Sequence, residues 1–311
     1  MNVLLETFPP PRPRWSTKKM PDRTGKVFLV TGGNAGLGYE TVKELLKKGG
    51  KVYMAARSRS KAEQAIEALE KETSKRAVFL ELDVGDLASV KRAAEEFKRQ
   101  ESQLNVLFNN AGVMMAPPEL FTPAGYDLQF GTNVLGHFYL IKLLLPTLLA
   151  TADANPDKPR IINTSSLAHR FFPQIDFELL HQDSPKRQEF KSLSSSKLYR
   201  QSKFGNIVLS NELARRYGDK IVSLALHPGN VATTSVQNDP GLAAKVAGWL
   251  LAEPWKGAIT QLYAGMAPEA AELGGQYLVP YARVGKANAN ANKVETGMEL
   301  WEWLEAQVKD I

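Results

Sequence analysis

The sequence predicts an α/β fold: a doubly wound sheet of seven parallel strands with helices on both faces, in a single domain. Short apolar runs alternate with helical segments of ten or more residues, the pattern of right-handed βαβ units. This alternation continues from about residue 25 to 280 with no repeat and no linker. A glycine-rich turn also joins the first apolar run to the first helical segment, as expected at the start of such a sheet.

Each strand is predicted where a short apolar run ends in turn-forming or polar residues. The seven expected strands are 27–30, 52–56, 77–82, 106–109, 160–164, 221–226 and 276–279. Apolar residues at three- and four-residue spacing predict the helices between them. These helices are 37–48, 61–72, 87–100, 125–149 and 195–217, and a last amphipathic helix at 295–309 is expected to pack against the body.

The remaining segments set the expected domain organisation. Residues 1–24 are proline-rich and basic and are expected to form an extended arm, leaving residues 25–311 as the domain. Two segments, 167–194 and 230–254, interrupt the alternation as insertions.

Composition and charge exclude several classes of function. The chain has 311 residues and no cysteine, which removes disulfides, zinc–thiolate sites, iron–sulfur clusters and cysteine nucleophiles. Its four histidines lack metal-ligand spacing, so no metal is expected. Of the net charge of +6, most lies in residues 1–26, which argues against a nucleic-acid-binding face. The longest apolar run, 134–150, is interrupted by polar residues and proline, so no membrane span is expected. Without a signal-peptide pattern, a cytoplasmic location is expected.

The turn after the first strand has the sequence Thr-Gly-Gly-Asn-Ala-Gly-Leu-Gly at 31–38. Gly32 suits a tight turn, Gly36 suits close approach of a diphosphate to the backbone, and Gly38 suits close packing of helix on strand. The following helix N-terminus offers N–H groups to phosphate oxygens. An ordinary βα turn is the alternative. The candidate dinucleotide-binding residues here are Gly32, Asn34, Gly36, Leu37 and Gly38.

The end of the second predicted strand indicates which dinucleotide is bound. An acid that would hold a free ribose hydroxyl is absent there, and Arg57 and Arg59 follow instead. Arginine suits a 2′-phosphate, so NADP(H) is preferred over NAD(H), although both side chains could be solvated loop charges. Asp83, followed by Val84, is placed to accept from an adenine amino group, or else to cap the helix at 87–100.

Four motifs in this order resemble the short-chain dehydrogenases/reductases. They are the 31–38 turn, Asn-Asn-Ala-Gly at 109–112, Asn-Thr-Ser-Ser at 163–166, and Tyr199 with Lys203 four residues later. The resemblance covers about residues 25–280 and implies a Rossmann-like fold. The segments 126–138 and 227–234, with the long Ser166–Tyr199 gap, are similar to the retinol dehydrogenase and WW-domain oxidoreductase branch.

The resemblance implies further cofactor contacts. Asn110, Ala111 and Gly112 are expected beside the cofactor, with Asn110 in a structural role. The Pro-Gly segment after the sixth strand is expected to contact the nicotinamide carboxamide, with an ordinary turn as the alternative. Its candidate residues are Pro228, Gly229, Val231 and Thr233.

The chemistry of hydride transfer to a carbonyl explains the catalytic candidates. The resulting alkoxide needs a proton, which Tyr199 can supply as general acid or remove as general base. Lys203 lies one helical turn away, and its charge would lower the pKa of Tyr199. The resemblance assigns Ser166 to the substrate oxygen and Asn133 to a water that feeds protons to Lys203. Ser165 competes with Ser166, and Asn133 could be an ordinary helix-interior hydrogen bonder.

The expected function is an NADP(H)-dependent ketoreductase or alcohol dehydrogenase acting on an apolar substrate. The two insertions would form the substrate wall, because both are rich in apolar side chains. These are Leu167, Phe171, Phe172, Ile175, Val246, Ala247, Trp249, Leu250, Leu251 and Trp255. A C=C reductase of the same fold and a non-catalytic nucleotide-binding regulatory scaffold are the alternatives. The resemblance also implies a homodimer through the helices that carry Asn133 and Tyr199, but leaves open whether this chain forms one.

Overall fold

The computed structural model describes residues 15–189, 194–229 and 253–311. They form one sheet in the order β3-β2-β1-β4-β5-β6-β7-β8, in which every pairing except β7–β8 is parallel. The strands are β1 Val27–Thr31, β2 Lys51–Ala56, β3 Val78–Glu81, β4 Val106–Asn109, β5 Arg160–Thr164, β6 Val222–Leu226, β7 Tyr277–Val279 and β8 Arg283–Val284. The doubly wound α/β prediction is confirmed, with the strand order reversing between β1 and β4.

The eighth strand corrects the expected count of seven. β8 is two residues long and pairs antiparallel with β7 through the turn at 280–282. In that turn Tyr281 and Ala282 have φ of 68° and 59°, in the left-handed region where glycine or asparagine is usual. Because neither residue is typical of such a turn, the sequence carries no hairpin signal there.

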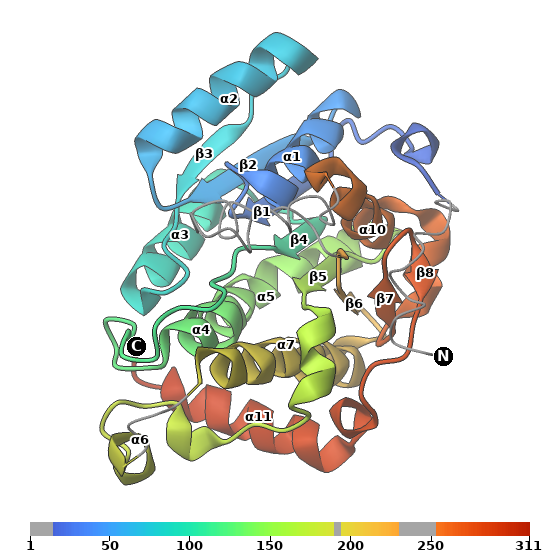
Figure 1. Ribbon diagram of the computed structural model, residues 1–311. Coiled ribbons are helices and arrows are strands. Elements are labelled where there is room, and N and C mark those ends of the chain that lie inside the picture. The colour runs from blue at the N-terminus through green and yellow to red at the C-terminus, as the bar shows by residue number, and fades with distance from the viewer. Residues whose placement is uncertain (1–14, 190–193, 230–252) are drawn as a thin grey trace.

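Helices cover both faces of the sheet (Figure 1). The helices of the described residues are α1 Gly36–Lys47, α2 Arg59–Thr73, α3 Leu87–Gln100, α4 Leu128–Phe130, α5 His137–Ala154, α6 Pro185–Glu189, α7 Ser195–Tyr217, α10 Pro254–Met266 and α11 Val294–Gln307. One apolar core joins the sheet to α3, α5, α7 and α11, and a second joins it to α1, α2 and α10. Apolar residues from alternate positions of each strand enter opposite cores, as buried parallel strands require.

The helix expected at 125–149 begins at Leu128 and ends at Ala154, and its middle part, Gly131–Gly136, is a π-helical turn. Among the described residues it is the one helix long and apolar enough to cross a membrane. However, 67% of its most apolar stretch is buried inside the protein. A core helix of a folded domain accounts for that composition.

Two terminal segments pack onto the domain. Trp15, within the predicted arm, is 4% exposed and meets Tyr263 of α10 edge-on, with 5.7 Å between ring centroids. At the other end, α11 lies alongside α7 (Figure 1), and its Trp301 contacts Phe138 of α5 while its Trp303 contacts Phe130 of α4. The expected C-terminal helix packed against the body is confirmed.

Candidate active site

The candidate site is a cleft of about 450 Å³ at the carboxyl edge of the sheet, next to the point between β1 and β4 where the strand order reverses. Ligands of open α/β sheets bind at this position. Most of the sequence-predicted residues line the cleft. They are Gly32, Asn34, Gly36, Leu37, Arg57, Asp83, Val84, Asn110, Ala111, Gly112, Tyr199, Lys203 and Pro228.

The glycine turn at one end of the cleft leaves room for an anion. Gly32 and Gly36 have φ of 65° and 53°, and no atom lies within 4 Å of a Cβ placed on Gly36. A Cβ on Gly38 would lie 2.2 Å from the Gly32 carbonyl oxygen, so this glycine lets α1 pack against the turn. The N-terminus of α1 has no side-chain cap and no acid in its first turn. Its N–H groups therefore fit a diphosphate.

The two arginines after β2 have different surroundings. Arg57 is exposed, lines the cleft and has no carboxylate within 4.0 Å in the described part of the chain. Arg59 does not line the cleft: it lies 3.7 Å from Glu81 and over the Phe79 ring at 4.5 Å. The interpretation of Arg59 as a second phosphate ligand therefore finds no support.

Asp83 lies in the loop that joins β3 to α3. Its carboxylate accepts from the Gly85 N–H at 2.9 Å, and it lines the cleft. Asp86, not Asp83, caps α3 by accepting from the Ala88 N–H. The alternative role of Asp83 as a helix cap is wrong.

Tyr199 and Lys203 occupy the other end of the cleft, on the first turns of α7. The Lys203 Nζ atom lies 5.8 Å from the centre of the Tyr199 ring and donates to the Thr164 carbonyl oxygen at 3.0 Å. Ser166 does not line the cleft, but its hydroxyl hydrogen-bonds with Tyr199. The helix spacing thus brings Tyr199 and Lys203 together, and the segment after β5 brings Ser166 to Tyr199.

The pKa values of this pair differ from the expectation. Burial raises the pKa of Tyr199, and the hydrogen bond from Ser166 opposes that rise without reversing it. Burial also lowers the pKa of Lys203 to about 8. The predicted lowering of the Tyr199 pKa is therefore not found in the free protein, because loss of hydration outweighs the other influences on the phenol.

The two neighbouring serines follow Thr164, the last residue of β5. Ser165 lines the cleft, but it is buried and its hydroxyl donates to the Lys203 carbonyl oxygen at 2.6 Å, which ties the end of β5 to α7. Ser166 begins the short 3-10 helix Leu167–Phe171 and keeps its hydroxyl near Tyr199. Of the two, Ser166 has the geometry expected of the catalytic candidate.

Asn133 lies in the π-helical turn and uses its side chain to hold the loop after β4. Its Oδ1 accepts from the Val113 N–H at 2.8 Å, and its Nδ2 donates to the Val113 carbonyl and to the Ser202 hydroxyl, each at 2.9 Å. A Cβ on Gly112 would lie 3.1 Å from Asn133 Oδ1 and 3.4 Å from Lys203 Nζ. Asn133 therefore lies close to Lys203, with Gly112 between them.

Some predicted residues lie elsewhere. Gly229 is outside the lining and has φ of 96°, and its N–H donates to His227 Nδ1 at 3.2 Å. Val231, Thr233 and nearly all of the second insertion lie outside the described residues.

Several lining residues were missed by the sequence reasoning. Thr132 and Thr164 line the cleft, and the Thr164 carbonyl holds both Lys203 and Asn206. The sequence did contain a signal for both as site residues, because Thr132 directly precedes Asn133 and Thr164 lies two residues before Ser166. Thr31 was missed as well, although its hydroxyl accepts from the N–H groups of Asn110 and Ala111.

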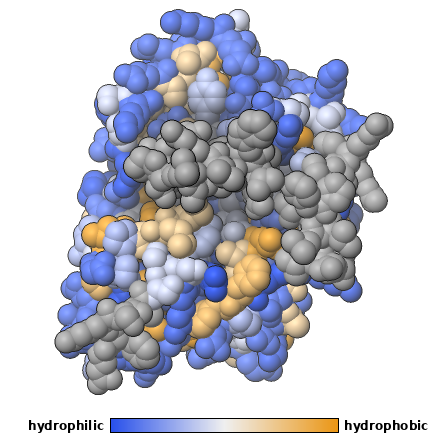
Figure 2. Space-filling model, in the orientation of Figure 1, coloured by the Kyte–Doolittle hydropathy of each residue, from blue (hydrophilic) through white to orange (hydrophobic). Residues whose placement is uncertain are grey.

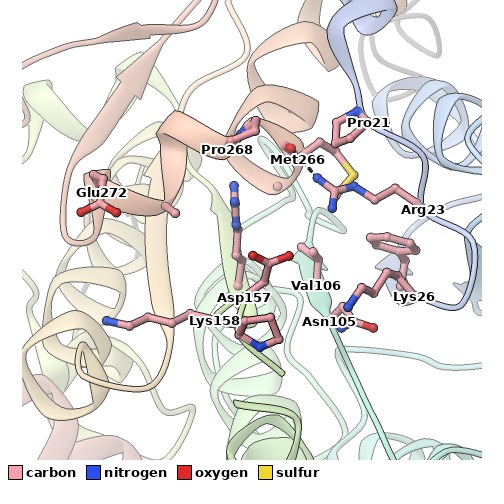
Figure 3. A pocket seen from close by; sticks show the side chains of 15 residues that line it. Pro21, Arg23, Lys26, Asn105, Val106, Asp157, Lys158, Met266, Pro268 and Glu272 are labelled. Atoms are coloured by element: carbon pink, nitrogen blue, oxygen red, sulfur yellow. Dashed lines mark hydrogen bonds between the residues drawn. The ribbon is translucent and has the colours of Figure 1, made fainter. Parts of the chain in front are cut away.

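A larger cavity, of about 580 Å³, lies at the opposite, amino edge of the sheet (Figure 3). Arg23 donates to the Met266 carbonyl, and Arg160 donates to the carbonyls of Ala264 and Ala267. These arginines thus cap the C-terminal end of α10. None of the predicted site residues line this cavity.

The cleft opens on a face with apolar surface. Figure 2 shows apolar patches on one face of the molecule. Met115 directly follows Met114, which lines the cleft, and Phe171 is the last residue of the 3-10 helix that begins after Ser166. Both residues are more than half exposed.

Comparison with known proteins identifies one family. The profile of the family described as short chain dehydrogenase matches residues 26–175. The chain is 50% identical over 308 residues to a short-chain dehydrogenase/reductase of Armillaria gallica, covering 99% of this chain and 98% of that protein. It is 39% identical over 332 residues to one from Phomopsis amygdali, covering 99% and 96%.

Solved structures share the fold. An uncharacterized protein of Mycobacterium paratuberculosis superposes with a TM-score of 0.70 at 29% identity, covering 95% of this chain and 97% of that one. The Pseudomonas aeruginosa RhlG/NADP active-site complex superposes with a TM-score of 0.65 at 24% identity, covering 83% and 95%.

Proposed function

The chain belongs to the short-chain dehydrogenase/reductase family of oxidoreductases, and we propose that it interconverts a carbonyl and an alcohol of an apolar substrate with NADP(H). One observation carries the proposal. A single cleft has the open glycine turn at one end and the Tyr199–Lys203 pair, with Ser166 behind it, at the other.

Arg57 supports NADP(H) over NAD(H). Its guanidinium is exposed at the cleft and free of carboxylates among the described residues, so a 2′-phosphate could bind it without displacing an ion pair. The structural neighbour RhlG was solved as a complex with NADP, which agrees with this preference.

The nicotinamide cofactor supplies or accepts the hydride. Tyr199 donates a proton to the substrate oxygen during reduction and accepts it during oxidation. Ser166 donates a hydrogen bond to the same oxygen and stabilises its developing charge. The Lys203 ammonium, held by Thr164, places a positive charge beside the phenol as that proton leaves.

Tyr199 is a neutral phenol at neutral pH in the free protein, because burial raises a pKa that is ordinarily already well above 7. This protonated form is the one that can donate to a carbonyl oxygen. The apolar surface next to the cleft, with Met115 and Phe171, supports an apolar substrate.

A substrate panel tests the proposed function. Purified protein is mixed with NADPH and, in turn, apolar aldehydes, ketones and α,β-unsaturated ketones, and NADPH absorbance is followed while products are identified. We expect alcohol products from apolar carbonyl compounds, and faster turnover with NADPH than with NADH. Products with a saturated C=C bond and an intact carbonyl would contradict the proposed reaction. NADPH binding without turnover of any panel member would instead favour the non-catalytic scaffold.

A further inference from the structure

Two buried histidines hold the main chain of two candidate catalytic residues. His137, 2% exposed, places Nδ1 at 3.1 Å from the carbonyl oxygen of Asn133, one helical turn before it. His169, with no exposed surface, places Nδ1 at 2.7 Å from the carbonyl oxygen of Ser166. The same ring atom is used in both cases.

These contacts determine where the proton of each imidazole lies. A carbonyl oxygen only accepts, so each Nδ1 carries a hydrogen and donates it. Burial lowers the pKa of both histidines to about 4, so each ring is neutral at pH 7 and its Nε2 is an acceptor. The Asn288 N–H donates to Nε2 of His169 at 3.2 Å.

Thr31 completes the arrangement at His137. Its Oγ1 lies 3.0 Å from His137 Nε2 and accepts from the N–H groups of Asn110 and Ala111, each at 2.9 Å. A hydroxyl has two acceptor positions and one donor. With both acceptor positions filled, the Thr31 hydroxyl has two acceptors for its own hydrogen, His137 Nε2 at 3.0 Å and the Phe108 carbonyl oxygen at 3.3 Å. The shorter distance favours donation to the neutral His137 ring. His137 thereby connects Asn133 to the loop that forms the floor of the cleft.

His169 makes a matching connection on the substrate side. Through Asn288 it ties Ser166 to residues 288–292, where the Asn288 side chain caps a short 3-10 helix and Asn290 donates to the Pro173 carbonyl. Ser166 in turn hydrogen-bonds with Tyr199. If the His169 proton moved from Nδ1 to Nε2, the bare Nδ1 atom and the Ser166 carbonyl oxygen would be two acceptors facing each other.

We propose that His137 and His169, each held as the Nδ1–H tautomer, are positioning residues that fix the backbone of Asn133 and of Ser166 relative to the cofactor cleft and the substrate oxygen. The inference rests on the proposed function, because it assigns these histidines to the same reaction. Neither histidine lines the cleft, so both act through the residues that they hold.

The first test needs no turnover. NMR of protein carrying ¹⁵N-labelled histidine reports the proton position on each imidazole of the intact chain. We expect His137 and His169 to be neutral Nδ1–H tautomers from pH 6 to 8. His227 provides an internal contrast, since its Nδ1 accepts from the Gly229 N–H and its proton must be on Nε2. An Nε2–H or charged imidazole at His137 or His169 would overturn the proposal.

The second test separates positioning from mere packing. Glutamine offers a donor group (its NH₂) and an acceptor group (its carbonyl oxygen), whereas leucine offers neither. We expect H169L to lower kcat by about tenfold or more without changing the Kd for NADPH, because Ser166 serves the substrate oxygen. H137L should lower kcat and also weaken NADPH binding, because the cleft floor loses its anchor at Thr31. H137Q and H169Q should recover most of each loss.

The control is H181L, which removes a partly exposed histidine away from the cleft and should change neither quantity. Leucine variants with wild-type kcat, or glutamine variants no better than leucine ones at equal melting temperature, would refute the positioning role. The proposed function fails separately, if the wild-type protein reduces no carbonyl compound. The tautomer measurement keeps the test decisive if a variant does not fold.

Discussion

At the end of β2, two arginines only two positions apart differ in what surrounds them. Arg59 is engaged by Glu81 and the Phe79 ring, while Arg57 faces the cleft without a carboxylate partner among the described residues. A charge-assisted hydrogen bond to a phosphate contributes about 1.5–3 kcal/mol. The difference between these residues therefore makes the cofactor assignment testable at a single position.

We expect Arg57→Ala to raise the Kd for NADPH by about tenfold or more and to leave the Kd for NADH within about twofold. Fluorescence titration of both nucleotides measures this. Arg59→Ala is the matched control and should leave both constants near the wild-type values. Equal losses of NADPH and NADH affinity in Arg57→Ala would remove the 2′-phosphate assignment.

Lys203 predicts a pH dependence. Its lowered pKa of about 8 means that the ammonium is present below pH 8 in the free protein and is lost as pH rises through that value. Because the charge assists the phenol, kcat/KM for NADPH should fall by about tenfold per pH unit above this pKa. The Lys203→Arg variant keeps its charge, so its residual activity should lack that decline. A flat wild-type profile from pH 7 to 10 would contradict the role of the charge.

Among the elements, those with strong apolar periodicity were predictable and those set by tertiary contacts were not. The seven parallel strands lie where buried apolar runs end in turns, because both of their faces are covered. The π-helical turn at Gly131–Gly136 has no periodic signal of its own. The short β8 depends on the left-handed Tyr281 and Ala282, whose side chains give no hint of a hairpin.

The contact between α11 and α7 depends on a single glycine. A Cβ on Gly297 would lie 2.5 Å from Glu212 Oε2 and 2.6 Å from an Arg215 nitrogen, and Glu212 is buried. The Glu212 carboxylate is held by Arg215 and Arg216, so it cannot easily move aside. Gly297 therefore lets the two helices approach at this ion cluster.

We expect Gly297→Ala to lower the free energy of unfolding by about 1–2 kcal/mol, because overpacking costs that much. Helix propensity alone would instead raise the free energy of unfolding, since alanine in a helix interior is about 1 kcal/mol more favourable than glycine. Urea denaturation distinguishes the two, with exposed Met298→Ala on the same helix as control. A stabilised Gly297→Ala variant would show that this approach is unimportant.

At the scale of the whole molecule, the position of α11 determines which surface is left exposed for contact with a second copy of the chain. Trp301 lies against Phe138 of α5 and Tyr217 of α7, the two helices through which the resemblance implied a homodimer, and Trp303 lies against Phe130 of α4. We expect a monomer of about 34.3 kDa in light scattering after size exclusion. A stable dimer whose interface includes α5 or α7 would show that α11 moves in solution.

The site was largely predictable because its residues follow strand ends, and parallel strand ends share one edge of the sheet. Gly36 and Arg57 were found in this way, whereas Tyr199 and Lys203 lie on α7 and were found from their four-residue spacing and the family resemblance. The residues that hold these site residues in place were not predictable from the sequence. His137, His169 and Thr31 act through main-chain carbonyls and N–H groups, and sequence spacing does not reveal which side chain meets a distant backbone atom.

The most direct test of the central claim is the Tyr199→Phe variant, assayed for NADPH-dependent carbonyl reduction and for NADPH binding. Loss of the transferable proton should lower kcat by about a thousandfold, and the Kd for NADPH should stay within about threefold of wild type. Tyr217→Phe, at the far end of the same helix, should behave as wild type. If Tyr199→Phe reduces carbonyl substrates at the wild-type rate, Tyr199 does not supply the proton and the proposed mechanism is wrong.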